Sequence, residues 1–150
     1  MTTARHISTV DGDAELAARL RLVVTRLSRR LRQQGETGIS ASQLSALSTI
    51  DRCGPMTLGD VATAEQVQPP SMTRIVSHLE ERGLVERQVY QRDRRVTRVH
   101  VTGEGRELLQ LSRTRKDAYL ARRLQTLNDG DRFTMAAAVA VLEQILERGE

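Results

Sequence analysis

The chain begins with a long segment whose apolar residues recur at helical spacing. From Asp13 onward they fall every three or four residues and share one face: Leu16, Leu20, Val23, Val24, Leu27 and Leu31. Arginines occupy much of the remaining surface, and Gly35 and Gly38 follow the last apolar position. This spacing predicts an amphipathic helix that ends at the glycines.

Two shorter helical segments follow. The first covers residues 41–53 and stops at Gly54-Pro55, a pair that does not continue a helix. The second opens at Thr57 with Asp60 three residues later, which is the spacing of a capping box. We expect the two helices to turn these apolar residues inward: Leu44, Leu47, Ile50, Leu58, Val61 and Ala62.

The next segment predicts a recognition helix and a wing. A helix begins at Pro69-Pro70, where missing N–H groups cost nothing, and ends at Gly83. Two β-branched runs, residues 84–90 and 96–101, follow it and are joined by an arginine-rich tip. A helix that fits a major groove beside a basic hairpin is typical of DNA-binding modules. The apolar face of this helix consists of Met72, Ile75, Val76 and Leu79.

The last part of the chain predicts two more helices, at about residues 104–127 and 131–148, with Thr102 capping the first. The fold class is therefore mainly α with a small β-hairpin wing. We expect a disordered N-terminus (1–11), a dimerisation helix (12–38), a winged helix-turn-helix DNA-binding domain (39–103) and two further dimerisation helices (104–150). The terminal helices carry more apolar surface than one small winged module covers, so the pattern favours a homodimer.

The charge distribution adds to this interpretation. The formal net charge is only +4, which alone favours a polyanionic partner weakly. Between Arg74 and Arg106, however, eight arginines face five carboxylates, and four of these arginines crowd the wing tip at positions 92, 94, 95 and 98. A basic patch at this place is what binding to DNA phosphates requires.

Other residue types narrow the function classes. The single cysteine, Cys53, excludes an internal disulfide framework and fits a reducing cytosol; it follows Ile50 by three residues, so we expect it near the apolar stripe as an inert side chain. No apolar run approaches the roughly 20 residues of a membrane span, and no secretory signal core is present, so we expect a cytoplasmic protein. The histidines (His6, His78, His100) lack partners at metal-ligand spacing, and we expect neither metal nor cofactor.

The chain resembles the MarR family of winged helix-turn-helix regulators over about residues 13–148. The resemblance is specific at Val61-Ala62 in the first helix of the turn motif and at residues 72–87, which include Leu79-Glu80-Glu81-Arg82-Gly83-Leu84-Val85-Glu86-Arg87. It is also specific at Asp93-Arg94-Arg95 and at Val101-Thr102-Gly103-Glu104-Gly105. Valine at 101, Gly103 at the helix start and the paired prolines depart from the family pattern. None of these departures removes a DNA-facing group.

The resemblance implies a dimeric transcription regulator, usually a repressor, on a pseudo-palindromic operator in double-stranded DNA. It also implies a small aromatic or phenolic effector in a cleft between the dimerisation helices and the winged domain. On the helix, Arg74 is the best candidate for reading guanine, because a guanidinium bonds O6 and N7 together. In the wing, Arg95 is expected to enter the minor groove, and Asp93 to hold the loop. The full set of candidate DNA-binding residues is Ser71, Thr73, Arg74, Ser77, His78, Arg92, Asp93, Arg94 and Arg95.

Other functions are weighed against this one. No nucleophile with a base, paired apolar carboxylates or glycine-rich phosphate loop supports an enzyme. A winged-helix protein–protein interaction module without a DNA role stays open, although the basic wing argues against it. A regulator of the same fold without a small-molecule effector, controlled by abundance or by Cys53, also stays open.

Overall fold

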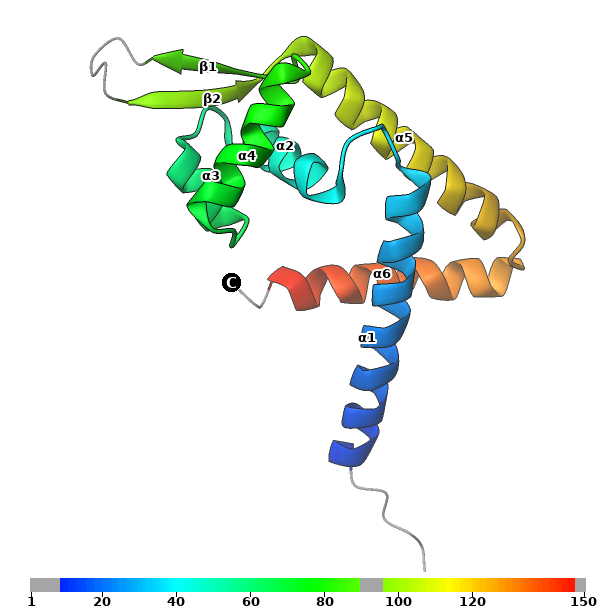
Figure 1. Cartoon of the computed structure of the whole chain (residues 1–150). Helices are drawn as coiled ribbons and strands as arrows, with labels where there is room; N and C mark the ends of the chain where they lie inside the picture. Colours follow the sequence, from blue (N-terminus) through cyan, green and yellow to red (C-terminus); the bar gives the residue numbers. More distant parts are fainter. Residues whose placement is uncertain (1–8, 90–95, 148–150) are drawn as a thin grey trace, which may run out of the picture.

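The computed structural model describes residues 9–89 and 96–147. Its element order is the following: α1 (Thr9–Gln34), α2 (Ala41–Cys53), α3 (Leu58–Ala64), α4 (Pro69–Glu81), β1 (Val85–Val89), β2 (Thr97–Val101), α5 (Gly103–Gln125) and α6 (Asp129–Glu147). The expected mainly α fold with one hairpin is confirmed (Figure 1).

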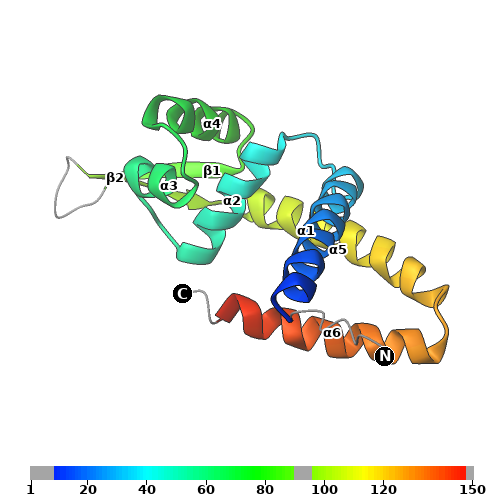
Figure 2. The ribbon, with the colours of Figure 1, turned by 90° about the horizontal axis from the view of Figure 1, so that it is seen from below.

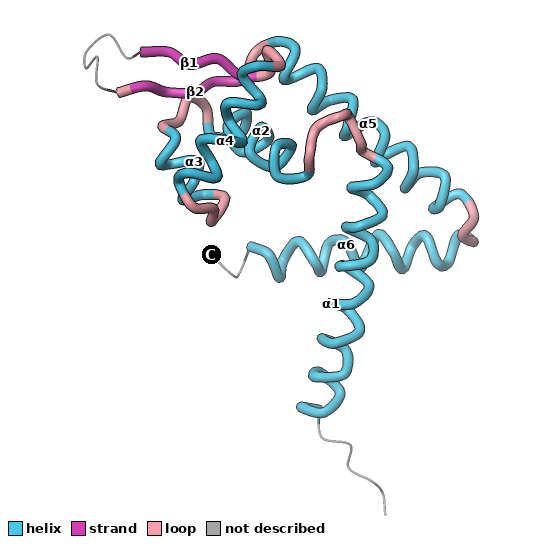
Figure 3. The backbone as a smooth tube through the Cα atoms, in the orientation of Figure 1, coloured by secondary structure: helices cyan, strands magenta, loops and turns pink. Residues whose placement is uncertain are grey.

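The elements form a small lobe with long helices attached to it. We call α2, α3, α4, β1 and β2 the winged lobe. The tube view places the hairpin at the edge of this lobe, next to the start of α5 (Figure 3). Helix α5 leads away from the lobe, and α1 packs against α5. Helix α6 turns back beyond the end of α5 (Figures 1 and 2).

Two helices of the winged lobe, α2 and α3, begin at side-chain caps. The Ser40 hydroxyl accepts from the Gln43 backbone N–H at 3.2 Å, while Gln43 Oε1 accepts from the Ser40 N–H at 2.8 Å. Thr57 and Asp60 form the same reciprocal pair at the start of α3, as the sequence predicted. Such boxes satisfy backbone donors that the first turn leaves free. They therefore fix where each helix starts.

The core of the winged lobe is aliphatic and lies between its three helices and the hairpin. The fully buried residues with the largest side chains include Leu47, Ile50, Val61, Met72, Val76, Leu79, Val85 and Val99. The strands pair antiparallel from Val85↔Val101 to Val89↔Thr97. Met56 adds two backbone hydrogen bonds with Val99, which anchor the second strand to the α2–α3 connection.

Most of the apolar stripe of α1 is exposed in the described part of the chain. Leu16 is 63% exposed and Val23 is 62% exposed, although the helical period of the sequence is present. In α6, Phe133 is 78% exposed and Leu146 is 75% exposed. From the sequence we expected α1, α5 and α6 to bury this surface against each other and against a second copy of the chain. Within the described part of the single chain, most of it is exposed to solvent.

Several boundaries differ from the sequence prediction. Helix α1 begins at Thr9 rather than Asp13, so residues 9–11 are helical and not part of a disordered terminus. β1 starts at Val85 rather than Leu84, β2 starts at Thr97 rather than Val96, and α6 starts at Asp129. The expectation of a shielded Cys53 is wrong. Cys53 is exposed because it is the last residue of α2, where no neighbouring element covers it.

Candidate nucleic-acid interface

Helix α4 is held by its inner face and presents a polar outer face. Pro69 and Pro70 occupy its first two positions, and the preceding Gln68 supplies no side-chain cap. Met72, Val76 and Leu79 are buried against α2 and α3, and Ile75 is partly buried. The helix is therefore packed rigidly in the lobe while its other side faces solvent, which is the requirement for a groove-reading helix.

The exposed face carries four of the five contact residues predicted on this helix. Ser71, Thr73, Arg74 and His78 are all exposed. The Thr73 hydroxyl donates to the Pro69 carbonyl at 3.0 Å, so it keeps only acceptor capacity for another group. His78 Nδ1 lies 3.5 Å from Gln43 Nε2, which connects this face to the cap of α2. The structure thus brings these four predicted residues together along one helix face.

Ser77 takes a different place from its predicted neighbours. It is half-buried, and its hydroxyl accepts from Arg87 Nη2 of β1 at 3.3 Å. The same guanidinium pairs with Glu80, with Arg87 Nε 2.9 Å from Glu80 Oε2. Arg87 therefore ties the first wing strand to the recognition helix. Sequence reasoning did not assign it a role, because the contact joins residues 10 positions apart across two elements.

The wing tip itself lies outside the described residues. This applies to Arg92, Asp93, Arg94 and Arg95, so their predicted roles stay predictions. The strands on either side of the tip are described; β1 starts, and β2 ends, beside the end of α4 (Figure 3). On β2, exposed Arg98 donates to the Pro55 carbonyl at 3.4 Å.

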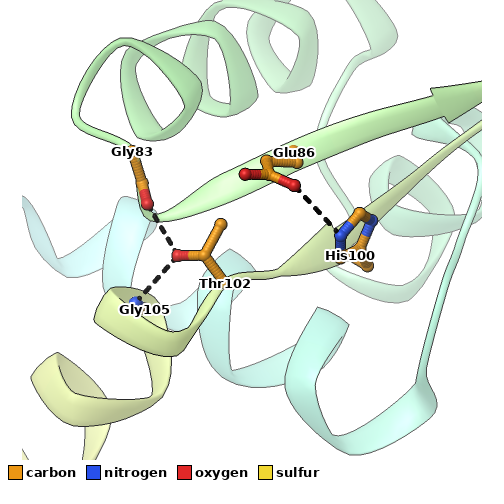
Figure 4. Close-up of polar contacts among 5 residues, drawn as sticks. All are labelled: Gly83, Glu86, His100, Thr102 and Gly105. Atoms are coloured by element: carbon orange, nitrogen blue, oxygen red, sulfur yellow. Dashed lines mark hydrogen bonds and ion pairs between the residues drawn. The ribbon is translucent and has the colours of Figure 1, made fainter.

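The base of the wing is joined to α5 by Thr102 (Figure 4). Its hydroxyl donates to the Gly83 carbonyl at 2.6 Å and accepts from the Gly105 N–H at 3.1 Å. Across the hairpin, His100 Nε2 lies 3.4 Å from Glu86 Oε2. One threonine thus caps α5 and fixes the exit of the recognition helix, so the departure at Gly103 leaves the joint defined.

The loop between α1 and α2 is bound from two sides. Arg82, the C-cap of α4, donates to the Gly38 carbonyl. Arg115 of α5 donates to the Glu36 carbonyl. These arginines connect the recognition helix and the long helix α5 to the same short loop.

A cleft of about 670 Å³ lies between α5, the end of α1 and the inner side of the winged lobe. A site of this size suits a small molecule, since ligand pockets usually measure about 300–1,000 Å³. Glu65 stands at one side of it, and its carboxylate accepts from Ser45 Oγ at 2.6 Å and Thr49 Oγ1 at 2.5 Å. Ser112 of α5 stands in the lining as well and is 2% exposed.

Two other kinds of site find no support in the described part of the chain. Across residues 9–89 and 96–147, no group of three or more histidine, cysteine, aspartate or glutamate side chains is placed to hold a metal ion. None of the helices described there is both long enough and apolar enough to cross a membrane.

Comparison with known proteins agrees with this geometry. The MarR family model matches residues 39–97, which contain α2, α3, α4 and β1 and end at the first residue of β2. An HTH-type transcriptional regulator of Mycobacterium tuberculosis is 40% identical over 139 residues, which cover 92% of this chain and 97% of the relative. The chain belongs to the MarR family.

Solved structures of MarR-type regulators share the fold. A transcriptional regulator from Pseudomonas aeruginosa superposes with a TM-score of 0.80 at 34% identity, covering 90% of this chain and 96% of the other. A mutant of MepR from Staphylococcus aureus, solved bound to an oligodeoxyribonucleotide, has a TM-score of 0.70 at 20% identity and covers 87% of this chain and 97% of its own. The protein is thus a MarR-family transcriptional regulator with a DNA-binding fold, in a family of regulators rather than enzymes.

Proposed function

We propose that this MarR-family protein is a homodimeric, sequence-specific DNA-binding repressor that a small-molecule effector releases from its operator. The observation that carries the proposal is the arrangement of α4, buried on one face and polar on the other, beside a hairpin with an arginine-rich tip. A MepR mutant with the same fold is known bound to an oligodeoxyribonucleotide.

In the proposed complex, α4 lies in the major groove and the wing flanks it. Arg74 reads a guanine, while Ser71 and His78 contact the backbone or base edges. Thr73 accepts rather than donates, because its proton is committed to Pro69. Ser77 does not contact DNA directly; its hydroxyl accepts a hydrogen bond from Arg87 and so helps to position that guanidinium. Arg95, with Arg92 and Arg94 beside it, reaches the minor groove, and Asp93 holds the tip.

The exposed apolar surfaces of α1 and α6 support a dimer made with a second copy. Their charges are complementary: α1 contains six arginines and three carboxylates, whereas α6 contains four carboxylates and one arginine. Apolar stripes rimmed by opposite charges favour pairing of α1 from one copy with α6 from the other. A two-fold dimer also presents two recognition helices to a pseudo-palindromic site.

The cleft supports the effector half of the proposal. It is bounded by α5 on one side and by Met72 and Ile75 of α4 on the other. A ligand that binds there contacts the inner face of the recognition helix without touching DNA. It releases the operator only if it favours a placement of α4 that DNA does not fit.

The test is a mobility shift of the purified protein on DNA flanking its own gene, titrated with unlabelled random DNA. We expect a discrete complex that survives excess competitor. Arg74→Ala and Arg95→Ala should each weaken it by roughly 10- to 100-fold, whereas Arg122→Ala, at an exposed site on α5, should not. Wild-type affinity in both variants would contradict the contact model. Affinity that ignores salt would instead favour the protein–protein module.

A further inference from the structure

We propose that the cleft selects an amphipathic aliphatic monocarboxylate, with its carboxylate beside Ser112 and Lys116 and its chain against the inner face of α4. This inference rests on the proposed effector function and names the ligand class. The family resemblance implied an aromatic or phenolic effector. The lining of this chain favours a different one.

The position proposed for the ligand's carboxylate is beside a buried serine hydroxyl that makes no hydrogen bond within the described part of the chain. Ser112 Oγ is buried, and no group in the described part of the chain hydrogen-bonds to it. A buried polar atom without a partner costs stability, so its retention in the lining points to a ligand atom. Lys116 lies one helical turn further along α5 and lines the same cleft. A hydroxyl and an ammonium at this spacing are suited to bind one carboxylate.

The close approach of α1 concentrates these polar groups. A Cβ built on Gly35 would collide with Lys116 Cε and would lie 2.8 Å from Ser112 Oγ. The end of α1 therefore crosses α5 directly over the two side chains, and the absence of a Cβ at Gly35 leaves them room in their present positions. The stem of Lys116 thus passes on the side of the cleft where Ser112 lies.

The charges around the cleft favour an anion. Four cations line it: Arg32, Arg52, Arg113 and Lys116. Arg113 also pairs with Asp51, with 3.8 Å between Arg113 Nη2 and Asp51 Oδ2. The acidic member of the lining is Glu65, whose two oxygens already accept hydroxyl protons from Ser45 and Thr49. The surplus of positive charge therefore attracts a carboxylate, and Glu65 repels it from the opposite side.

The rest of the lining suits a hydrocarbon chain. Its larger apolar side chains come from four parts of the fold and carry methyl, methylene or thioether groups: Leu44, Val67, Met72, Ile75 and Leu109. Each CH₂ that a flexible chain buries against such groups strengthens its binding through the hydrophobic effect. Met72 and Ile75 belong to α4, so a hydrocarbon chain bound here contacts the inner face of the recognition helix.

The experiment measures binding of decanoate to the full-length protein by isothermal titration calorimetry, without DNA and below the micelle concentration of the ligand. Decanol, with the same chain and no charge, and salicylate, an aromatic carboxylate, are compared under the same conditions. We expect decanoate to bind at least tenfold more tightly than either. Because no DNA is present, the result is independent of whether the protein binds an operator.

The variants test the carboxylate end. Lys116→Met keeps the stem that packs at Gly35 and removes the charge, and Ser112→Ala removes the hydroxyl. Each should weaken decanoate binding by roughly tenfold and leave decanol binding unchanged, whereas Arg122→Met removes a cation of α5 outside the cleft and should change neither. Equal binding of decanoate and decanol, tighter binding of salicylate, or unchanged decanoate binding in both cleft variants would each overturn the proposal.

Discussion

Arg87 of β1 and Glu80 of α4 form an ion pair of 2.9 Å that joins the wing to the recognition helix. The same guanidinium reaches Ser77, so two residues of the helix are held by one strand residue. The two parts of the proposed DNA-binding surface therefore keep a fixed relative orientation. Both partners are about a third or more exposed, so the pair contributes no more than about 1 kcal/mol to stability.

Arg87 could act on DNA in two ways: it could position the wing through its ion pair with Glu80, or it could contact a phosphate directly. A substitution at Glu80 distinguishes between them. Glu80→Gln removes a negative charge from the recognition helix, which on charge alone should strengthen binding to DNA. If Arg87 positions the wing, Glu80→Gln should instead weaken operator binding, by roughly 3- to 10-fold, as should Arg87→Met. Fluorescence anisotropy with labelled operator measures both. Stronger binding by Glu80→Gln would mean that Arg87 contacts phosphate and does not act through the helix.

The joint between wing and α5 allows a matched pair of glycine variants. A Cβ on Gly105 would collide with the Leu84 carbonyl oxygen and lie 2.7 Å from Val101 Cγ1, whereas a Cβ on Gly103 meets nothing within 4 Å. Gly105→Ala should therefore lower the free energy of unfolding by about 1–3 kcal/mol. Gly103→Ala should leave it unchanged or raise it by up to about 1 kcal/mol. Urea denaturation, monitored by circular dichroism, measures the free energy of unfolding of both variants. Equal effects of the two substitutions would contradict the close packing at Gly105.

Local signals in the sequence predicted the winged lobe well. The bounds of α2 were correct because Gly54-Pro55 ends the helix whatever packs around it, and the Thr57–Asp60 box placed the start of α3. The exposed residues of α4 followed from its helical period. The predicted contacts at 92–95 lie outside the described residues and stay predictions.

What the sequence did not predict depends on contacts between distant segments. Periodicity indicated the apolar stripe of α1, and the terminal helices were expected to bury it together with a second copy; in the described part of the single chain most of the stripe stays exposed. Cys53 was assigned to the interior from its spacing to Ile50, although its helix ends there. The contacts of Arg87 with Ser77 and of Glu65 with Ser45 join residues 10 and 20 positions apart. No local pattern marks such pairs.

The apolar surface of α6 predicts that a single charge disrupts the proposed dimer. Val141 is 55% exposed in the isolated chain and lies on the same helix face as Phe133 and Ile145. Val141→Asp should weaken self-association by roughly 100-fold or more, because an unpaired carboxylate is costly to bury. Sedimentation velocity over a range of concentrations measures this. Ser71→Asp, which adds the same charge at an exposed position of α4, is the control, and an unchanged dimer in Val141→Asp would place the interface elsewhere.

The turn between α3 and α4 holds Gln66 in a left-handed conformation, with φ of 53°. For a residue with a Cβ this conformation costs roughly 1–2 kcal/mol, and the turn keeps it through the hydrogen bond from the Val67 N–H to the Ala62 carbonyl at 2.9 Å. Gln66→Gly should therefore raise the free energy of unfolding, by about 0.5–1 kcal/mol, since part of the gain is offset by the freedom of glycine in the unfolded chain. Gln66→Ala keeps the Cβ and should bring no such gain. Thermal unfolding of the three proteins measures the difference. A less stable Gln66→Gly would show that the glutamine side chain itself stabilises the turn.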